Sequence, residues 1–227
     1  MRDLIKSALA ITWKDLYAEW RTKQVFSTML IFSGLVIVTF SFAFDPTNNT
    51  IRAVIPGMIW VITIFAGILG LNRSFISEQY NDSLHGLIVS PIDPSSIYFG
   101  KFLSNFIIVL FVQMITIPLL FILFDYKMNG NILLFLLVLF LGSAGFICVG
   151  TFLAALSANS RSSEMLLPII LFPVISPIVI AAVQSTRILL IDVEEIESLF
   201  SWISLMAGYD LLFFVFCFFL FEFIMEV

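Results

Sequence analysis

The sequence predicts an all-α integral membrane protein, a bundle of six transmembrane helices preceded by an amphipathic interfacial helix. Composition is the first reason, because hydrophobic residues make up 60% of the 227 residues and the mean hydropathy is +1.08, above the usual range of soluble domains. The second reason is that six apolar segments recur along the chain, each close to or above the ~20 residues that cross a bilayer as a helix. We therefore expect one membrane domain over residues 1–227.

An amphipathic pattern in residues 1–23 predicts the interfacial helix. Apolar side chains recur every three or four residues and form one stripe, made of Ile5, Leu9, Trp13, Leu16 and Trp20. Cations occupy other sides of the same helix, at Lys6, Lys14 and Arg21. A helix with tryptophans on one face and cations on another lies flat among lipid headgroups. The alternative is a soluble helix that packs on a partner.

The six apolar segments follow in order, and their ends fit one topology. The segments are residues 24–44, 51–71, 102–124, 132–157, 165–187 and 200–223. With the N-terminus in the cytoplasm, most of the 11 Lys and Arg residues fall on the cytoplasmic side, as the positive-inside rule requires. These residues are Arg2, Lys6, Lys14, Arg21, Lys23, Arg73, Lys101 and Arg161, which leaves Arg52, Lys127 and Arg187 outside. An even number of spans returns the C-terminus to the cytoplasm.

This topology divides the membrane domain into the interfacial helix 1–23, spans one and two in 24–72, a cytoplasmic segment 73–101, and spans three to six in 102–227. The outer connection between spans five and six is acidic, with Asp192, Glu194, Glu195 and Glu197. We interpret it as a solvated turn that keeps the topology fixed, the alternative being a small amphipathic helix on the outer surface.

The longest interruption of the apolar pattern is the stretch of residues 72–101. Side chains at helical spacing predict a short amphipathic helix within it, and they are Glu78, Asp82 and His85. Pro91 ends that helix. Asp93 then supplies an N-cap and Pro94 a first helical residue, so a second helix begins there. An arrangement of helix, break and helix that is fixed to two spans can dock in a groove on a partner.

Three polar side chains lie inside predicted spans, where they need protein or water around them. They are Asn105 and Gln113 in the third span and Asp210 in the sixth. Asp210 is a functional candidate because an ionisable residue inside the hydrocarbon is functional by default. Burial in a packed helix interface is the alternative.

Small residues and prolines mark sites of close packing and bending. Residues with small side chains recur four apart at Ala53 and Gly57, at Ala66 and Gly70, and at Gly150, Ala154 and Ala158. This spacing lets helices approach closely within one bundle, or alternatively along a homodimer seam. The fifth span contains Pro168, Pro173 and Pro177. Each proline removes a backbone hydrogen bond and predicts a hinge, although membrane helices also tolerate prolines without moving.

The sequence lacks the motifs of several enzyme classes. It contains no G-x-x-x-x-G-K-[ST] nucleotide-binding loop, no H-E-x-x-H and no C-x-x-C-H haem attachment sequence, and His85 is its single histidine. Cys148 and Cys217 lie within apolar segments, which favours buried thiols over a disulfide or a zinc site. The few basic residues argue against nucleic-acid binding. We expect no catalytic residue, no metal site and no directly bound cofactor.

Three stretches resemble one known family. They are WKDLYAEWRTK at residues 13–23, LNRSFISEQYNDSLHGLIVSPIDPSSIYFGK at residues 71–101 and YDLLFFVFCFFLFEFIMEV at residues 209–227. Over essentially its whole length, the chain resembles the B subunit of the cytochrome c maturation system, also called haem exporter protein B. Residues 78–101, with GLIVSPID followed by IYFGK, are the most specific part of the resemblance.

The resemblance implies the membrane subunit of a type-2 ABC exporter in the bacterial inner membrane. A separate A subunit would hydrolyse ATP, and the C, D and haem-chaperone E components would be further partners. It also implies that residues 73–100 form the coupling segment that contacts the ATPase. The residues expected to make this contact are Glu78, Asp82, His85, Gly86, Ser90, Pro91 and Asp93.

The resemblance leaves two mechanisms and two other functions open. Haem would be a transported or handled ligand, or ATP hydrolysis would free the loaded haem chaperone from the C subunit. The chain offers no obvious haem ligand pair, which favours the second mechanism. One alternative function is the permease subunit of another type-2 ABC exporter, for a lipid, glycan or drug. The other is a membrane scaffold that does not couple to ATP.

Overall fold

The described residues of this computed structural model are 2–44, 49–80, 93–128, 130–158, 163–191 and 196–225. They form seven helices and contain no strand, which confirms the predicted all-α class. The helices are α1 (Arg2–Thr22), α2 (Gln24–Ala43), α3 (Asn49–Tyr80), α5 (Pro94–Leu123), α6 (Ile132–Ala158), α7 (Ser163–Leu190) and α8 (Ile196–Met225). Within the described residues, six of these helices, α2 to α8, are long and apolar enough to cross a membrane.

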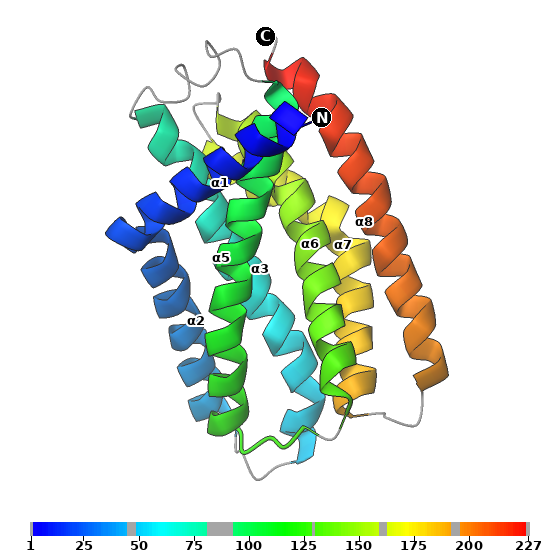
Figure 1. Ribbon diagram of the computed structural model, residues 1–227. Coiled ribbons are helices and arrows are strands. Elements are labelled where there is room, and N and C mark those ends of the chain that lie inside the picture. Colours follow the sequence, from blue (N-terminus) through cyan, green and yellow to red (C-terminus); the bar gives the residue numbers. More distant parts are fainter. Residues whose placement is uncertain are drawn as a thin grey trace.

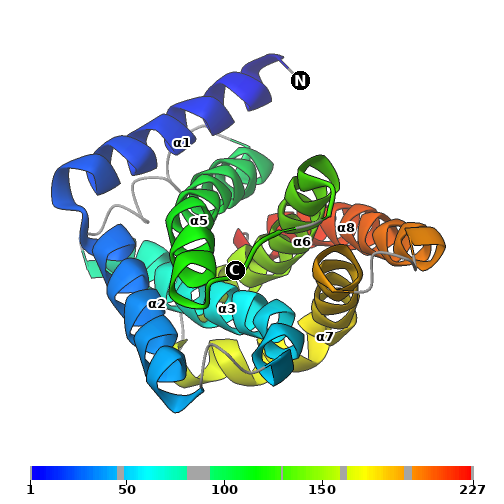
Figure 2. The ribbon, with the colours of Figure 1, turned by 90° about the horizontal axis from the view of Figure 1, so that it is seen from below.

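The six long helices run side by side, and α1 lies across one end of the bundle (Figure 1). Both chain termini lie at this end, which we call the α1 end. Seen along the bundle, α3 lies near its centre, whereas α2 and α8 lie at the rim (Figure 2). Burial agrees with this arrangement, because α3 is the most buried of the spans and α2 and α8 are the least buried.

The helices at the α1 end are longer than the apolar pattern predicts. Residues 72–80 continue α3, and α5 begins at Pro94 rather than near Phe102. The polar stretch therefore contains the ends of two spans, and the helix expected to begin at Asp93 and Pro94 is the start of α5 itself. At the other end, Ile196 and Glu197 belong to α8, so the rest of the acidic connection lies outside the described residues.

A fixed elbow joins α1 to α2. Lys23 between the two helices adopts a left-handed conformation with φ 52°, which turns the chain sharply. The Glu19 side chain then caps the new helix, because its Oε1 accepts a hydrogen bond from the backbone N–H of Phe26 at 2.8 Å. The Lys23 carbonyl accepts from the N–H of Ser27 at 3.0 Å. These contacts hold α1 at a set angle to the first span.

The apolar stripe of α1 faces away from the rest of the chain. Trp13 is 72% exposed and Trp20 is 79% exposed, whereas Ala8 and Ile11 are buried against α5. The predicted helix over residues 1–23 is thus confirmed, and the bundle leaves its stripe uncovered. Contact with lipid headgroups remains a prediction that fits this exposure.

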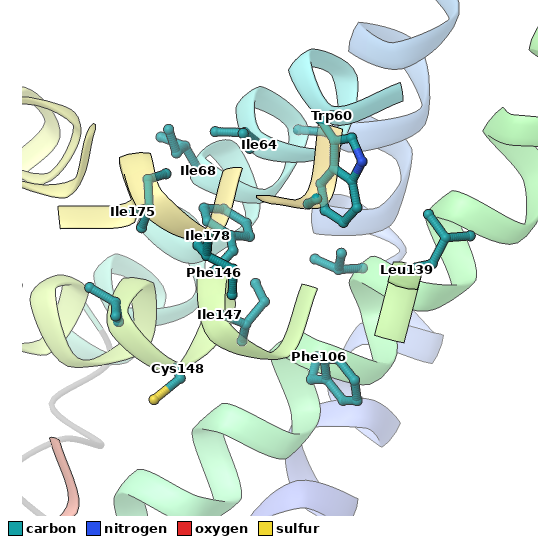
Figure 3. Packing of buried hydrophobic residues seen from close by; sticks show 14 of the residues in the cluster. Trp60, Ile64, Ile68, Phe106, Leu139, Phe146, Ile147, Cys148, Ile175 and Ile178 are labelled. Atoms are coloured by element: carbon teal, nitrogen blue, oxygen red, sulfur yellow. The ribbon is translucent and has the colours of Figure 1, made fainter. Parts of the chain in front are cut away.

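The core lies where α3, α6 and α7 meet (Figure 3). Glycines make this contact close, because large side chains of one helix fill positions where the other has no side chain. Trp60 and Leu71 of α3 lie against Gly142 and Gly150 of α6, and Phe146 of α6 lies against Gly67 of α3. A Cβ atom added at any of these three glycines would collide with the facing side chain.

The predicted small-residue pairs are used in two ways. Ala66 is fully buried, and Gly70 lies against the Met29 side chain of α2, so this pair packs within the bundle. Ala53 is exposed, and nothing lies within 4 Å of a Cβ added at Gly57. That second pair faces outward, and the homodimer seam remains a prediction. Cys148 and Cys217 are free and buried, as expected.

At the end opposite α1, Tyr126 ties the connection between α5 and α6 to the end of α7. Its hydroxyl donates a hydrogen bond to the carbonyl of Leu190. Burial raises the pKa of this phenol, and nearby Arg52 opposes the shift. The hydroxyl therefore keeps its proton and acts as a donor at neutral pH.

We expect Gly142→Ala to lower the free energy of unfolding in detergent micelles by about 1–3 kcal/mol, the usual cost of overpacking a core. The facing Trp60 ring has nowhere to move, because it is 1% exposed and its Nε1 donates to Thr186 Oγ1 at 2.9 Å. Gly57→Ala is the matched control, and alanine is the better helix former there. Equal losses for the two variants would contradict this account of the packing.

Candidate functional site

The predicted coupling residues divide into described and undescribed positions. Asp82, His85, Gly86, Ser90 and Pro91 fall in residues 81–92, which lie outside the described part of the chain. Glu78 is in the last turns of α3, but its side chain is also outside the description. Asp93 is described and exposed.

Asp93 has a clear structural task at the start of α5. Its Oδ1 accepts a hydrogen bond from the backbone N–H of Ser95 at 3.0 Å, and Pro94 occupies the first turn. This confirms the predicted N-cap. Replacing Asp93 with lysine would therefore also remove the cap, and the contact of Asp93 with a partner remains a prediction.

The helices on either side of residues 81–92 meet at a buried lysine. Lys101 of α5 is 2% exposed, and its Nζ lies 3.0 Å from Oδ2 of Asp15 on α1. The same Nζ donates to the backbone carbonyl of Ser74 in α3 at 3.5 Å. One ammonium group thus contacts α1, the end of α3 and the start of α5. Lys14 adds an exposed contact to the other oxygen of Asp15 at 3.2 Å.

Close packing surrounds this ion pair. Gly100 lies so near α1 that an added Cβ would be 2.7 Å from Ile11 and 3.0 Å from the Ala8 carbonyl. The Thr12 hydroxyl donates to the Gly100 carbonyl at 3.2 Å, and Ser104 donates to Asp15 at 3.4 Å. Charge, hydrogen bonds and small residues therefore all join α1 to the first turns of α5.

Aromatic and sulfur groups hold the other side of those turns. The Tyr98 ring lies 5.3 Å from Phe221 of α8, measured between ring centroids. Its hydroxyl donates to the Cys148 carbonyl of α6 at 3.1 Å and lies 3.0 Å from the Cys148 thiol. The start of α5 thus contacts α1, α3, α6 and α8.

Gln113 joins three helices deep in the bundle. Its side chain is 3% exposed, and Nε2 donates to Thr63 of α3 at 3.1 Å and to Ser143 of α6 at 2.9 Å. Asn105, eight residues earlier on α5, is also buried, but its Nδ2 has no hydrogen-bond partner among the described residues. Both side chains face protein, as their position in a span requires.

Asp210 projects from α8 toward α6. Gly145 makes room for it, because a Cβ at that position would collide with Asp210 Oδ1 and with Ile178 of α7. Oδ1 is buried and has no hydrogen-bond partner among the described residues, and the residue as a whole is half-buried. The neighbouring Tyr209 hydroxyl donates to the Val174 carbonyl of α7 at 3.0 Å. Asp210 therefore occupies a helix interface, and its function remains a prediction.

The three prolines are inside one continuous helix, α7. Figure 2 shows that α7 changes direction between its yellow first half and its gold second half, and proline is the usual cause of such a bend. Pro177 cannot donate to the Pro173 carbonyl, and the Ser176 hydroxyl supplies that hydrogen bond at 2.9 Å. Pro168 is half-buried near the α1 end. The bend is observed, whereas hinge motion remains a prediction.

Neither the role of Asp15 nor the burial of Lys101 was predicted from the sequence. A signal was present, because Ala8, Ile11, Thr12 and Asp15 form a second stripe on α1 at spacings of three and four. A carboxylate at the end of an otherwise apolar and small stripe indicates a buried counter-charge. The apolar stripe with its tryptophans drew the interpretation toward lipid instead.

We expect Gln113→Leu to lower the free energy of unfolding in micelles by about 1–2 kcal/mol, because two hydroxyls lose a bond between membrane helices. Asn105→Leu is the matched control on the same helix, at a buried amide whose Nδ2 is unpaired. We expect that control to be neutral or stabilising. A larger loss for the control than for Gln113→Leu would contradict the assigned hydrogen bonds.

Comparison with known proteins gives one family. The model of the family described as "CcmB protein" matches residues 6–223 of this chain.

Three relatives, each named "Heme exporter protein B", illustrate the similarity. The protein of Rhodobacter capsulatus is 25% identical over 178 residues, which cover 78% of this chain and 81% of the relative. The protein of Pseudomonas aeruginosa is 25% identical over 151 residues, or 66% of this chain and 67% of the relative. The protein of Haemophilus influenzae is 24% identical over 174 residues, or 77% and 78%.

Proposed function

The chain belongs to the family of CcmB proteins, and we propose that it is the membrane permease subunit of an ABC complex for cytochrome c maturation. The observation that carries this proposal is the family match over residues 6–223, together with six helices of membrane-spanning length among the described residues. The relatives' name, heme exporter protein B, gives the substrate class as haem.

Energy comes from a separate ATPase in this proposal. The sequence contains no nucleotide-binding loop of the G-x-x-x-x-G-K-[ST] form, so the chain needs a partner for ATP hydrolysis. We propose that this partner is the A-type ATPase subunit, and that the C, D and haem-chaperone E components complete the assembly. The chain itself is non-catalytic.

The α1 end faces the cytoplasm in this proposal. Lys and Arg residues concentrate at that end, which favours a cytoplasmic location by the positive-inside rule. Both termini are then cytoplasmic and the membrane is the bacterial inner membrane. Residues 81–92, between α3 and α5, contact the ATPase from this side, with Glu78 and Asp93 at the margins of the contact.

Two mechanisms fit such a complex, and the histidine content favours one. A haem iron held by two histidines requires a pair, and the chain has one histidine, His85. We therefore propose that ATP hydrolysis releases the loaded haem chaperone from the C subunit, rather than moving haem through this chain. Haem is then handled by the complex and is not a resident cofactor of this subunit.

Deletion of the chain tests the function, with covalent c-type haem and the loading state of the haem chaperone as readouts. We expect c-type haem to be lost while loaded chaperone accumulates, because its release needs the complex. An empty chaperone would contradict release and support haem transport instead. Normal c-type haem would contradict both mechanisms and favour another type-2 exporter.

We propose that the acidic Glu78 and Asp82 face a basic groove on the ATPase. We therefore expect the double variant Glu78→Lys with Asp82→Lys to reduce the ATPase recovered with the purified chain by roughly tenfold or more, because like charges opposed at an interface cost several kcal/mol. Glu197→Lys, exposed at the opposite end of the bundle, is the control and retains the ATPase. Undiminished recovery with the double variant would contradict the proposed docking surface. At Asp93, the lysine variant is compared with Asp93→Asn, which keeps a capping side chain.

A further inference from the structure

We propose that the Asp15–Lys101 ion pair is a mechanical link, which makes α1 move as one body with the helices on both sides of residues 81–92 and passes their displacement into α2. The inference rests on the proposed function, in which residues 81–92 contact an ATPase. It assigns Asp15 and Lys101 a positioning role in that process.

The ion pair resists separation of α1 from α5. Lys101 is 2% exposed, and the Asp15 carboxylate 3.0 Å away is 13% exposed. Pulling α1 from α5 would separate this buried ammonium group from the Asp15 carboxylate, and breaking a buried ion pair is strongly unfavourable. The close contact of Gly100 with Ile11 and Ala8 adds packing at the same place.

Both helices that flank residues 81–92, α3 and α5, contact the Lys101 ammonium group. Lys101 is the eighth residue of α5, and the Ser74 carbonyl that its Nζ also contacts is in α3, six residues before that helix ends at Tyr80. The two helices that flank residues 81–92 in the chain, α3 and α5, therefore both contact one ammonium group. A force on that segment reaches α1 through this group whichever flanking helix it moves.

The elbow at Lys23 connects α1 to α2, the first span. Glu19 caps α2 through the N–H of Phe26 at 2.8 Å, only four residues after Asp15 on the same helix. With Lys23 in the left-handed conformation, α1 and α2 are held at a fixed angle, so a displacement of α1 also displaces α2. Because α2 is among the least buried spans, it can shift while few buried contacts are broken.

The outer face of α1 suits such a movement. Its stripe of Ile5, Leu9, Trp13 and Trp20 is more than half exposed and makes no large contact with the bundle. A helix held to lipid headgroups by an apolar face slides in the plane of the membrane more readily than one locked on all sides by protein. Because lipid leaves α1 free to slide, the ion pair makes it move together with α3 and α5.

The test compares coupling in the purified complex with the ATPase and in cells that make c-type cytochrome. The central variant is Asp15→Asn with Lys101→Met, because removing both charges of a buried pair together is often neutral for stability, whereas removing one of them is not. The matched control is Lys14→Met, which removes the exposed contact to Asp15 and keeps the buried one. The charge swap, Asp15→Lys with Lys101→Asp, tests whether the pair itself matters.

We expect the central variant to keep its ATPase and to hydrolyse ATP, while c-type haem formed per ATP hydrolysed falls roughly 2- to 30-fold, the range over which residues between two sites modulate coupling. The control stays at the wild-type ratio, and the swap regains part of the loss. A wild-type ratio in the central variant overturns the proposal. Loss of the ATPase also overturns it, because the pair would then serve docking.

A second measurement needs no destabilising change. Spin labels are placed at exposed positions Tyr17 on α1 and Arg73 on α3, and at Glu197 at the start of α8, a helix outside the body that α1 is proposed to join. On trapping the ATP-bound complex, we expect the 17–73 distance to stay constant and the 17–197 distance to change. Equal change in both distances, or none in either, overturns the proposal. A wild-type chain that recovers no ATPase would instead refute the proposed function.

Discussion

The buried ammonium group of Lys101 is the constraint on which the α1 end depends. A cation removed from water needs an anion beside it, since desolvation of an ion costs several kcal/mol even after the protein relaxes. Asp15 meets this need only if α1 lies across the start of α5, and Ser74 contributes its carbonyl only if α3 ends nearby. One charge thus fixes the relative position of three helices. The elbow at Lys23 then sets where α2 enters the bundle.

Away from this pair, the bundle is held by shape and by a few shared hydrogen bonds. Trp60 and Leu71 fill positions opened by Gly142 and Gly150, which makes α3 and α6 a close pair. Gln113 bonds this pair to α5, and the Trp60 indole bonds it to α7. The interior is therefore stiff, whereas α2 and α8 at its margins are the least buried spans. A stiff interior with less buried margins suits a subunit that receives motion from a partner.

Much of the fold could be predicted from the sequence, because lipid leaves so few structures possible. The six spans follow from apolar length, and the cap at Asp93 with Pro94 follows from local backbone chemistry. The extension of α3 to Tyr80, and the continuation of the helix that begins at Pro94 into the third span, could not be predicted, since polar residues continue a helix beyond the apolar segment wherever neighbouring helices support it. Asp210 was predicted as a polar group inside a span. Its place beside Gly145, where no side chain blocks the carboxylate, depends on the register between α6 and α8. The Asp15–Lys101 pair joins residues 86 positions apart, and local spacing alone does not specify such a contact.

The account depends most directly on the side of the membrane that the α1 end faces. A maleimide that cannot cross the membrane would be applied to intact cells carrying Ser83→Cys, with Glu194→Cys as the outward control; the native Cys148 and Cys217 are buried and give little background. The account predicts that position 83 reacts only after the membrane is permeabilised, while position 194 reacts from outside. Labelling of position 83 from outside would contradict this topology, because the α1 end, where α1, α3 and α5 meet at Lys101, would then face away from any cytoplasmic ATPase.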